Sequence, residues 1–336
     1  MANLKYFYGS LLVTIAGLIA AFFVGHEHPL TAVYITAVLA LLEISLSFDN
    51  AVINARVLAD MPMFWRKLFI YIGLPIAVFG MRLIFPILLV DMTTQLSFID
   101  VFHLATSDPH AYHHALLQGM PMISAFGGAF LLKVFLGFFF DKEKNVHWVP
   151  FLEANRAIKA ASNLPGVSLL LSLIAGMILI YYTKDWQVAL AYLSGIILHE
   201  LLSVMGLLFN QPASSGQTLV RNGLISFIYL EFLDASFSFD GVIGAFAIST
   251  NIFIIMIGLG IGAMFVRSLT IFLVEKKTLS SFPYLEHGAH YAIGFLACVM
   301  SIKMFHHVPE AITGTVGIGL IIIACLHSYI ERRIKS

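Results

Sequence analysis

The chain has 336 residues, of which 59% are hydrophobic and only 11% are charged, and its formal net charge is zero. Soluble globular domains carry about 25% charged residues. The composition therefore excludes an ordinary soluble protein and favours a multi-pass protein whose surroundings are the lipid bilayer. No basic stripe is present, so we expect no nucleic-acid partner.

Apolar runs of about 20 residues, the length that crosses a bilayer as a helix, recur from end to end. They predict an all-α membrane protein of about ten transmembrane helices, over residues 8–24, 31–55, 68–90, 119–140, 165–182, 187–209, 223–249, 251–274, 285–305 and 311–330. The first run resembles the apolar part of a signal peptide, but no convincing cleavage site accompanies it, so we expect a retained helix.

The Lys and Arg residues between these runs fall in alternate connections. One set of connections holds Arg56, Arg66, Lys67, Lys142, Lys144, Arg156, Lys159, Arg221, Lys276 and Lys277, whereas the opposite set holds only Lys184. Because basic connections face the cytoplasm, we expect both termini in the cytoplasm and the protein in the cell (inner) membrane.

One acidic motif occurs twice. The first copy runs from Glu43 to Asn50 (EISLSFDN), and the second from Glu231 to Gly241 (EFLDASFSFDG). Both contain Ser-x-Ser-Phe-Asp, followed by Asn50 or Gly241. An acid at the centre of a membrane helix costs about 2.5–3.5 kcal/mol on insertion scales, so a repeated acidic motif predicts a functional site.

The helices after each copy also resemble one another. Arg82 and Arg267 follow the two motifs, and Lys133 and Lys303 follow the arginines. This order recurs five expected helices later, and an odd offset inverts the topology, as in many secondary transporters. We expect one transport domain over residues 1–336, with a first repeat at about 8–182 and a second at about 187–330. The alternative is chance similarity among apolar helices.

The intramembrane charges do not balance. Away from their ends, the expected helices contain six acids, Glu43, Asp49, Glu200, Glu231, Asp234 and Asp240, and three charge-balancing bases, Arg82, Arg267 and Lys133. Salt bridges between them are the structural alternative to a binding site, and they leave three acids over. Such an excess predicts a bound cation or protonated carboxyls.

The motif side chains define the chemistry of the expected site. The candidate metal ligands are Glu43, Asp49, Asn50, Glu231, Asp234 and Asp240, and the candidate further ligands or proton relays are Glu200, Ser47 and Ser238. All of them offer hard oxygen atoms, which suit Mn²⁺, Ca²⁺ or Mg²⁺. We expect no resident cofactor, since the cation is cargo.

The spacing of the acids predicts broken helices. Glu231 and Asp240 are nine residues apart, about half a turn away in azimuth on a regular helix. Paired serines compete for backbone hydrogen bonds, and Asn50 and Gly241 tolerate left-handed backbone. We therefore expect both motif helices to unwind near the membrane midplane and to expose carbonyl oxygens.

The two motifs resemble the signatures of TerC-type membrane proteins. The likeness rests on Glu43-x5-Asp49-Asn50-Ala51 and on Glu231-x2-Asp234-x5-Asp240 followed by Gly-Val-Ile-Gly-Ala-Phe-Ala-Ile. Residues 119–148 resemble a TerC-related branch known as a domain of unknown function. The likeness implies an inverted-repeat metal exporter and implicates the six motif residues. The chain departs from the commoner pattern at Gly241, where many members have Ser, and in its His-rich segment near residues 103–114.

These observations predict a secondary transporter that exports a divalent cation, Mn²⁺ in the first place, with protons as a candidate counter-ion. The alternative is a metal-sensing or tellurite-resistance membrane module without transport of its own. No motif supplies a catalytic constellation: His199-Glu200 lacks the second His of a zinc-protease motif. We therefore expect no enzyme, and the metal ion, the bilayer and a second copy of the chain in a homodimer are the partners considered.

Overall fold

The computed structural model describes residues 4–26, 28–93, 96–209, 217–249, 251–276, 278, 282–306 and 308–335. This part of the chain contains helices and connections but no strand, which confirms the expected all-α fold. The chain divides into two compact units. Unit 1 comprises residues 1–120 and 219–276, and unit 2 comprises residues 121–218 and 277–336.

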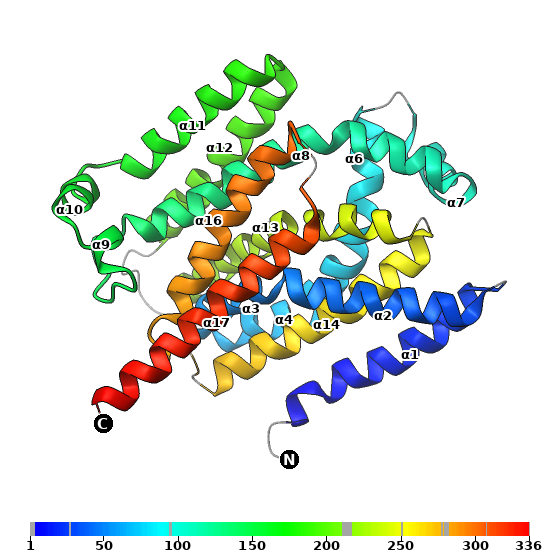
Figure 1. Cartoon of the computed structure of the whole chain (residues 1–336), viewed down its shortest axis with the longest axis horizontal. Helices are drawn as coiled ribbons and strands as arrows, with labels where there is room; N and C mark the ends of the chain where they lie inside the picture. Colours follow the sequence, from blue (N-terminus) through cyan, green and yellow to red (C-terminus); the bar gives the residue numbers. More distant parts are fainter. Residues whose placement is uncertain are drawn as a thin grey trace. The chain divides into compact units, whose positions relative to one another are not determined.

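Within the described residues, unit 1 contains α1–α7, two later α-helices and the short segments η1 and η2 (Figure 1). In chain order these elements are η1 (Leu4–Phe7), α1 (Tyr8–Val24), α2 (Pro29–Leu46), α3 (Phe48–Asp60), α4 (Met63–Tyr71), α5 (Gly73–Pro75), the π-helical segment η2 (Ile76–Ile84), α6 (Phe85–Thr93), α7 (Phe98–Ser107), α13 (Gln217–Ile248) and α14 (Ile252–Glu275). The first part of α8 (Pro109–Phe139) also belongs here.

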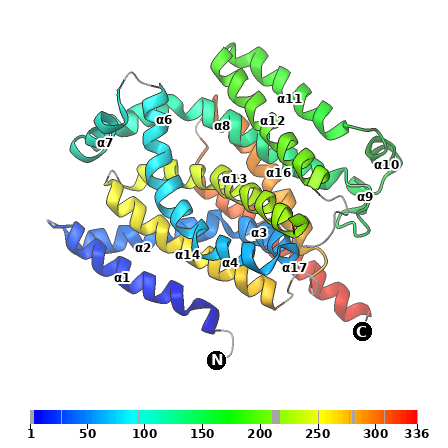
Figure 2. The same ribbon diagram turned by 180° about the vertical axis from the view of Figure 1, so that it is seen from behind.

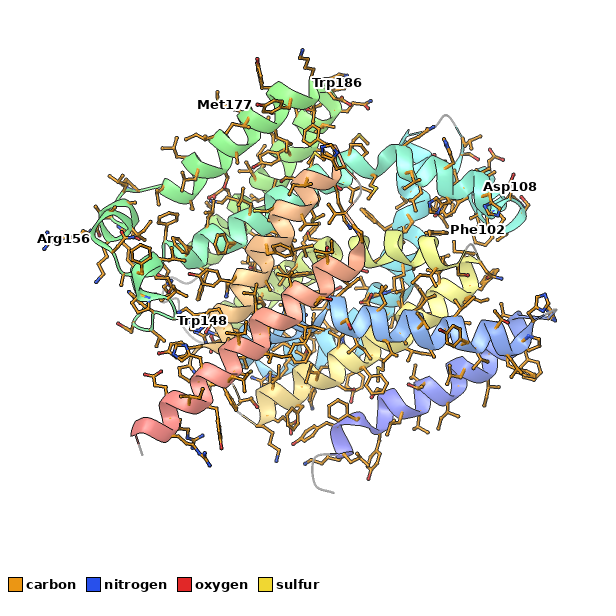
Figure 3. All side chains as sticks on the ribbon, viewed as in Figure 1. Phe102, Asp108, Trp148, Arg156, Met177 and Trp186 are labelled. Atoms are coloured by element: carbon orange, nitrogen blue, oxygen red, sulfur yellow. The ribbon has the colours of Figure 1, made fainter. Side chains whose placement is uncertain are left out.

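Unit 2 contains the rest of α8 and the helices of the middle and the end of the chain. They are α9 (Pro150–Glu153), α10 (Arg156–Ser162), α11 (Val167–Thr183), α12 (Trp186–Phe209), α16 (Leu285–Lys303) and α17 (Glu310–Lys335). Met177 on α11 and Trp186 at the start of α12 point away from the other helices of the unit (Figure 3) and are 71% and 68% exposed. Large apolar side chains exposed in this way suit contact with lipid.

Each of the ten expected membrane ranges overlaps a helix of the structure. Within the described residues, six helices are long and apolar enough to cross a membrane, or up to eight if each of two bent pairs counts as one span. The pairs are Met63–Tyr71 with Ile76–Leu88, bent by 46°, and Arg156–Ser162 with Val167–Thr183, bent by 99°. The protein is therefore a multi-pass membrane protein, and the number of ten stays a prediction.

Two glycines on α14 allow α2 to pack closely against it. A Cβ atom on Gly258 would lie 2.6 Å from Leu39 Cβ, and one on Gly262 would lie 2.5 Å from Glu43 Cβ. Glycines four residues apart on one helix face let two membrane helices approach backbone to backbone. This contact holds Glu43 in place beside α14.

A buried apolar cluster fixes α4 beside α3 and α13. It comprises Leu58, Met61, Trp65, Phe69 and Leu230. Gly223 on α13 makes room for the indole, because a Cβ atom there would lie 1.9 Å from Trp65 Cδ1. The cluster brings the end of α4, with the backbone of Phe69, next to α13.

The two copies of the acidic motif have different backbones. In the first, α2 ends at Leu46 and α3 begins at Phe48, so the helix is interrupted at Ser47 as expected. The expected exposure of carbonyl oxygens is not found for Glu43 and Ser47, because their carbonyls accept the N–H groups of Ser47 (3.0 Å) and Ala51 (3.1 Å). In the second, α13 continues from Gln217 to Ile248 without interruption. The expected break in the second copy is therefore wrong. Ser236 there donates to the carbonyl of Phe232 (2.9 Å), four residues back, which is compatible with a continuous helix.

The two compact units do not coincide with the two halves of the sequence. Unit 1 takes α2–α6 from the first half and α13–α14 from the second, which are the segments that carry the two motifs and the two arginines. Within this unit α13 runs opposite to α2 and α3 (Figures 1 and 2). Opposite directions are what an inverted repeat requires, and the repeat itself stays a prediction.

Candidate functional site

The first motif places Glu43 in a buried ion pair with Arg82. Glu43 Oε1 accepts hydrogen bonds from Arg82 Nη2 (2.5 Å) and from Ser47 Oγ (2.8 Å). Arg82 also donates from Nη1 to the carbonyl of Ala77 (2.5 Å). Both charged side chains are at most 4% exposed, so the pair is withdrawn from solvent. Each member needs the other, because an unpaired buried charge is costly.

The irregular backbone of η2 explains why Arg82 can donate a hydrogen bond to the carbonyl of Ala77 as well as to Glu43. The segment is π-helical, a form that often marks functional sites. Pro86 follows it and has no N–H to donate to the Arg82 carbonyl four residues earlier, so regular α-helical bonding is broken here in any case. The Arg82 side chain reaches back five residues to the Ala77 carbonyl, which ties the guanidinium to its own helix.

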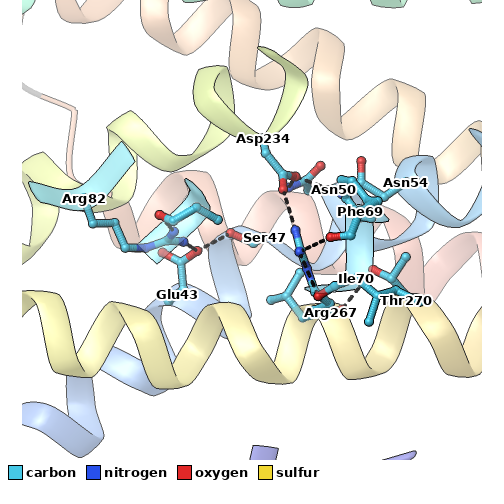
Figure 4. A network of polar contacts seen from close by, with 12 residues as sticks. Glu43, Ser47, Asn50, Asn54, Phe69, Ile70, Arg82, Asp234, Arg267 and Thr270 are labelled. Atoms are coloured by element: carbon cyan, nitrogen blue, oxygen red, sulfur yellow. Dashed lines mark hydrogen bonds and ion pairs between the residues drawn. The ribbon is translucent and has the colours of Figure 1, made fainter. Parts of the chain in front are cut away.

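The second motif places Asp234 in a buried network of four side chains. Asp234 Oδ1 accepts hydrogen bonds from the amides of Asn50 (2.6 Å) and Asn54 (2.8 Å), and Oδ2 lies 3.5 Å from Arg267 Nη2. Arg267 Nη1 also donates to the carbonyl of Phe69, and the guanidinium lies over the Phe69 ring (4.3 Å from Cζ to the ring centroid). Figure 4 shows this group apart from the one around Glu43.

Asn54 is a functional candidate that the sequence reasoning missed. It lies one helical turn after Asn50 on α3, so both amides share one face of the helix. A carboxylate only accepts hydrogen bonds, so each amide must turn its NH₂ to Asp234 and its oxygen away. The sequence does carry a signal for Asn54, because it is a second asparagine four residues after Asn50 in an apolar run.

The two ion pairs occupy equivalent places in the two motif copies. Glu43 and Asp234 each precede the first Ser of their Ser-x-Ser-Phe-Asp by two residues, and each pairs with the arginine of the following expected helix. The contacts between copies are also equivalent. Asn50 contacts Asp234, and Gly241, which follows the second motif as Asn50 follows the first, abuts Glu43.

A narrow cavity of about 20 Å³ connects the two pairs inside unit 1. Its polar lining comprises Glu43, Ser47, Asn50, Asn54, Arg82, Asp234, Ser238, Arg267 and Thr270. Among the described residues, five buried atoms of this lining have no hydrogen-bond partner: the donor Arg82 Nε and the oxygens Glu43 Oε2, Asn50 Oδ1, Asn54 Oδ1 and Ser238 Oγ. All four oxygens can accept a hydrogen bond or bind a cation. Such unmet buried acceptors are rare in folded proteins and call for an explanation, such as a bound ion or water.

The cavity has two ends. Glu43 and Asn54 are eleven residues apart along α2 and α3, which is about 16 Å at the helical rise of 1.5 Å per residue. We call the surroundings of Glu43, Arg82 and Ser47 the Glu43 end, and those of Asp234, Asn50 and Arg267 the Asp234 end. One ion therefore cannot touch all four unpartnered oxygens at once.

Of the remaining motif acids, Asp49 and Glu231 do not line this cavity. Asp49 is buried on the first turn of α3 and accepts the N–H of Asn50 (2.9 Å), where a negative charge is favourable. Both carboxyl oxygens of Glu231 are buried without a hydrogen-bond partner. The side chain of Asp240 is not among those described. Among the described residues, no three His, Cys, Asp or Glu side chains come together as metal ligands.

Lys133 and Glu200 form a separate ion pair within unit 2. Lys133 Nζ lies 2.5 Å from Glu200 Oε1 and 3.0 Å from Ser168 Oγ, so α8, α12 and α11 meet at this lysine. Lys133 is buried, whereas the Glu200 side chain is 36% exposed. The partner of Lys133 is thus Glu200 rather than a motif acid. A relay or ligand role for Glu200 stays a prediction.

A buried carboxylate also anchors the connection between α8 and α10. Glu153 contacts Lys144 Nζ (2.9 Å) and accepts hydrogen bonds from Tyr291 Oη (3.0 Å) and from the N–H of Val149 (3.3 Å). Burial alone would raise the pKa of Glu153. The hydrogen bond and charge of Lys144, with smaller contributions from His287 and Val149, outweigh it and hold the pKa below its ordinary value of 4.5.

The fold and the buried charges define a multi-pass α-helical membrane protein of transporter-like construction. The chain belongs to the family described as "Protein of unknown function (DUF475)", which matches residues 48–335. It is similar to the "Uncharacterized membrane protein YceF" of Bacillus subtilis (strain 168), with 29% identity over 108 residues. This match covers 32% of the chain and spans 41% of the length of that relative. No solved structure matches the chain.

Proposed function

We propose that the chain is a secondary transporter that exports a divalent cation, Mn²⁺ above others, from the cytoplasm. The observation that carries the proposal is the cavity in unit 1, where buried oxygen atoms of Glu43, Asn50, Asn54 and Ser238 lack hydrogen-bond partners. Leaving such atoms unsatisfied costs about 1–3 kcal/mol each. A cation that passes through the cavity satisfies them with the hard oxygen ligands it prefers.

The charge around the cavity favours a cation over an anion or a neutral solute. Unit 1 buries four described motif acids, Glu43, Asp49, Glu231 and Asp234, against two arginines, Arg82 and Arg267. The excess of two negative charges matches the charge of one divalent ion. In the proposed cycle the arginines neutralise Glu43 and Asp234 whenever no cation is bound, and protons or another ion accompany the return step.

The size of the cavity favours an ion that sheds its water. A single water needs about 10–15 Å³, so about 20 Å³ admits little more than one guest of that size. Mg²⁺ dehydrates reluctantly, and Ca²⁺ takes about 6–8 oxygen ligands, more than either end of the cavity offers unpartnered. Mn²⁺ accepts the same carboxylate and carbonyl oxygens and also takes about six of them, so the preference for Mn²⁺ rests on the likeness of the motifs to the TerC-type signatures.

Metal uptake into inside-out membrane vesicles tests the proposal. We expect Mn²⁺ uptake by the wild type and its selective loss in Glu43→Gln, Asp49→Asn and Asp240→Asn, with each variant still folded. Asp60→Asn is the matched control, because Asp60 ends the same helix α3 with a side chain that is 76% exposed. Wild-type uptake in all three site variants would contradict the assignment of the site.

The same vesicles separate transport from sensing. If the purified protein binds Mn²⁺ but moves none under any ion gradient, the metal-sensing module is the better account and export is wrong. A pH gradient imposed with and without Mn²⁺ identifies the counter-ion: acceleration by a gradient in one direction only supports exchange with protons.

A further inference from the structure

The two ends of the cavity are equivalent in sequence but differ at one residue. At the Asp234 end, the amide of Asn50 occupies the space next to the carboxylate and donates to Oδ1 at 2.6 Å. At the Glu43 end, the residue in the equivalent place is Gly241, which has no side chain to donate. A Cβ atom on Gly241 would lie 3.0 Å from Glu43 Oε2.

This difference decides which carboxylate oxygen is open. Both oxygens of Asp234 have partners, since Asn50 and Asn54 donate to Oδ1 and Arg267 lies near Oδ2. Glu43 uses only Oε1, for Arg82 and Ser47, and its Oε2 is buried without a partner. At the Asp234 end the carboxylate oxygens are therefore taken and only neutral amide oxygens are unpartnered, whereas the Glu43 end holds a buried, unused carboxylate oxygen.

A second unpartnered oxygen atom lies on the face of α13 that carries Gly241. Ser238 lies three residues before Gly241 on α13, so the two share one face of that helix. Ser238 is 5% exposed, lines the cavity, and its Oγ has no hydrogen-bond partner. A carboxylate oxygen and a hydroxyl oxygen, both buried and both unused, are suitable ligands for a hard divalent cation.

We infer that the transported cation binds at the Glu43 end, between Glu43 Oε2 and Ser238 Oγ, and that Gly241 is the specificity-determining residue that keeps this position open. The inference rests on the proposed function. It assigns the transported cation to Glu43 rather than to Asp234, the equivalent carboxylate of the second motif copy. Glu43 then bridges the cation and Arg82 through its two oxygens. The guanidinium stays anchored to the Ala77 carbonyl, so it need not leave when the cation arrives.

Substitution of Gly241 tests this inference directly. Gly241→Asn recreates at Glu43 the amide that Asn50 gives to Asp234, so it should donate to Oε2 and occupy the cation position. We expect the affinity of the purified full chain for Mn²⁺, measured by loss of the free-ion electron paramagnetic resonance signal, to fall about 10- to 100-fold. Gly241→Ala adds only the Cβ atom and should weaken binding less.

Two controls separate this effect from packing. Gly137→Asn adds the same amide to an exposed glycine of α8 that has open space around it, and it should leave Mn²⁺ affinity unchanged. Thermal unfolding without metal shows how much each variant destabilises the fold. If Gly241→Asn does not fold, Gly241→Ala decides: weaker binding by folded protein supports the inference, and unchanged binding overturns it.

The outcomes distinguish the inference from the function on which it rests. Unchanged Mn²⁺ affinity in folded Gly241→Asn, with loss of affinity in Asp49→Asn, overturns the assignment to the Glu43 end but leaves cation transport intact. Failure of the wild type to bind Mn²⁺, Ca²⁺ or Mg²⁺ overturns both proposals. Loss of binding in both Gly241→Asn and Ser238→Ala, with Gly137→Asn unaffected, supports the inference.

Discussion

The amide of Asn50 donates a 2.6 Å hydrogen bond to the carboxylate of Asp234, which lies 184 residues further along the chain. The two residues belong to the two copies of one acidic motif, and both are buried. The contact joins α3 to α13 in the interior of unit 1. It also means that neither copy completes its polar contacts alone, so the variants below should affect both copies.

Replacing Asn54 by Leu should destabilise the protein through Asp234. The change removes one of the two amides that donate to Asp234 Oδ1, at 2.8 Å. Loss of a hydrogen bond to a buried charged group costs about 1.5–3 kcal/mol. Thermal unfolding in detergent measures the loss. Asn145→Leu, at an exposed position of the connection after α8, should change stability by no more than about 0.5 kcal/mol.

Replacing Arg82 by Gln should destabilise more strongly, because it leaves the Glu43 carboxylate buried without its cation. Breaking a buried pair from one side costs about 3–5 kcal/mol. The double variant Glu43→Gln/Arg82→Gln removes both charges and should recover much of the loss. A double variant no more stable than Arg82→Gln would contradict the pairing as the source of the effect.

Gly262→Ala should push α2 away from α14. The added Cβ atom would lie 2.5 Å from Glu43 Cβ and 2.8 Å from the carbonyl of Ala40, so the backbone must move. Overpacking of this kind costs about 1–3 kcal/mol. Gly319→Ala, on α17 with no neighbour within 4 Å, is the matched control and should be close to neutral. Equal melting temperatures for the two variants would show that the contact tolerates expansion.

Acid should weaken the anchor of the connection between α8 and α10. The pKa of Glu153 lies below its ordinary value of 4.5 in the folded protein, so folding favours the ionised form. The stability that this carboxylate contributes is fully present above pH 4.5 and is lost as the pH falls through the lower folded pKa. Hydrogen exchange of residues 144–153 between pH 6 and pH 3 measures it, and Glu153→Gln should remove the pH dependence.

The sequence indicated the parts of the site better than their arrangement. The apolar runs indicated the multi-pass helical fold. The charges within these runs indicated the doubled motif and the arginine that follows each copy. The partners of those arginines were not indicated, because Arg82 and Glu43 are 39 residues apart and meet only because η2 and α2 both pack against α14. Asn54 was missed for a similar reason: its spacing of four residues from Asn50 is visible in the sequence, but its contact with Asp234 is not.

The backbone of the two motif copies could not be predicted from their short sequences alone. Both copies contain Ser-x-Ser-Phe-Asp, yet the helix is interrupted at Ser47 and continuous through Ser238. In the first copy, Asp49 accepts the N–H of Asn50 and so supports a new helix start. In the second, Ser236 bonds back within the helix. Identical short sequences permit both outcomes, and the packing around them selects one.

The π-helical segment η2 makes the ion pair of Arg82 depend on chain length as well as on residue type. Each residue of a regular α-helix turns the chain by about 100°, because 3.6 residues complete one turn. Removing one residue between Ile76 and Met81 would let α-helical bonding close over this stretch. Because a π-turn holds one residue more than an α-turn, the following residues would keep their direction and Arg82 would stay beside Glu43. A one-residue insertion would instead rotate the following residues by roughly that angle and carry Arg82 away, which for Glu43 is equivalent to loss of the arginine itself.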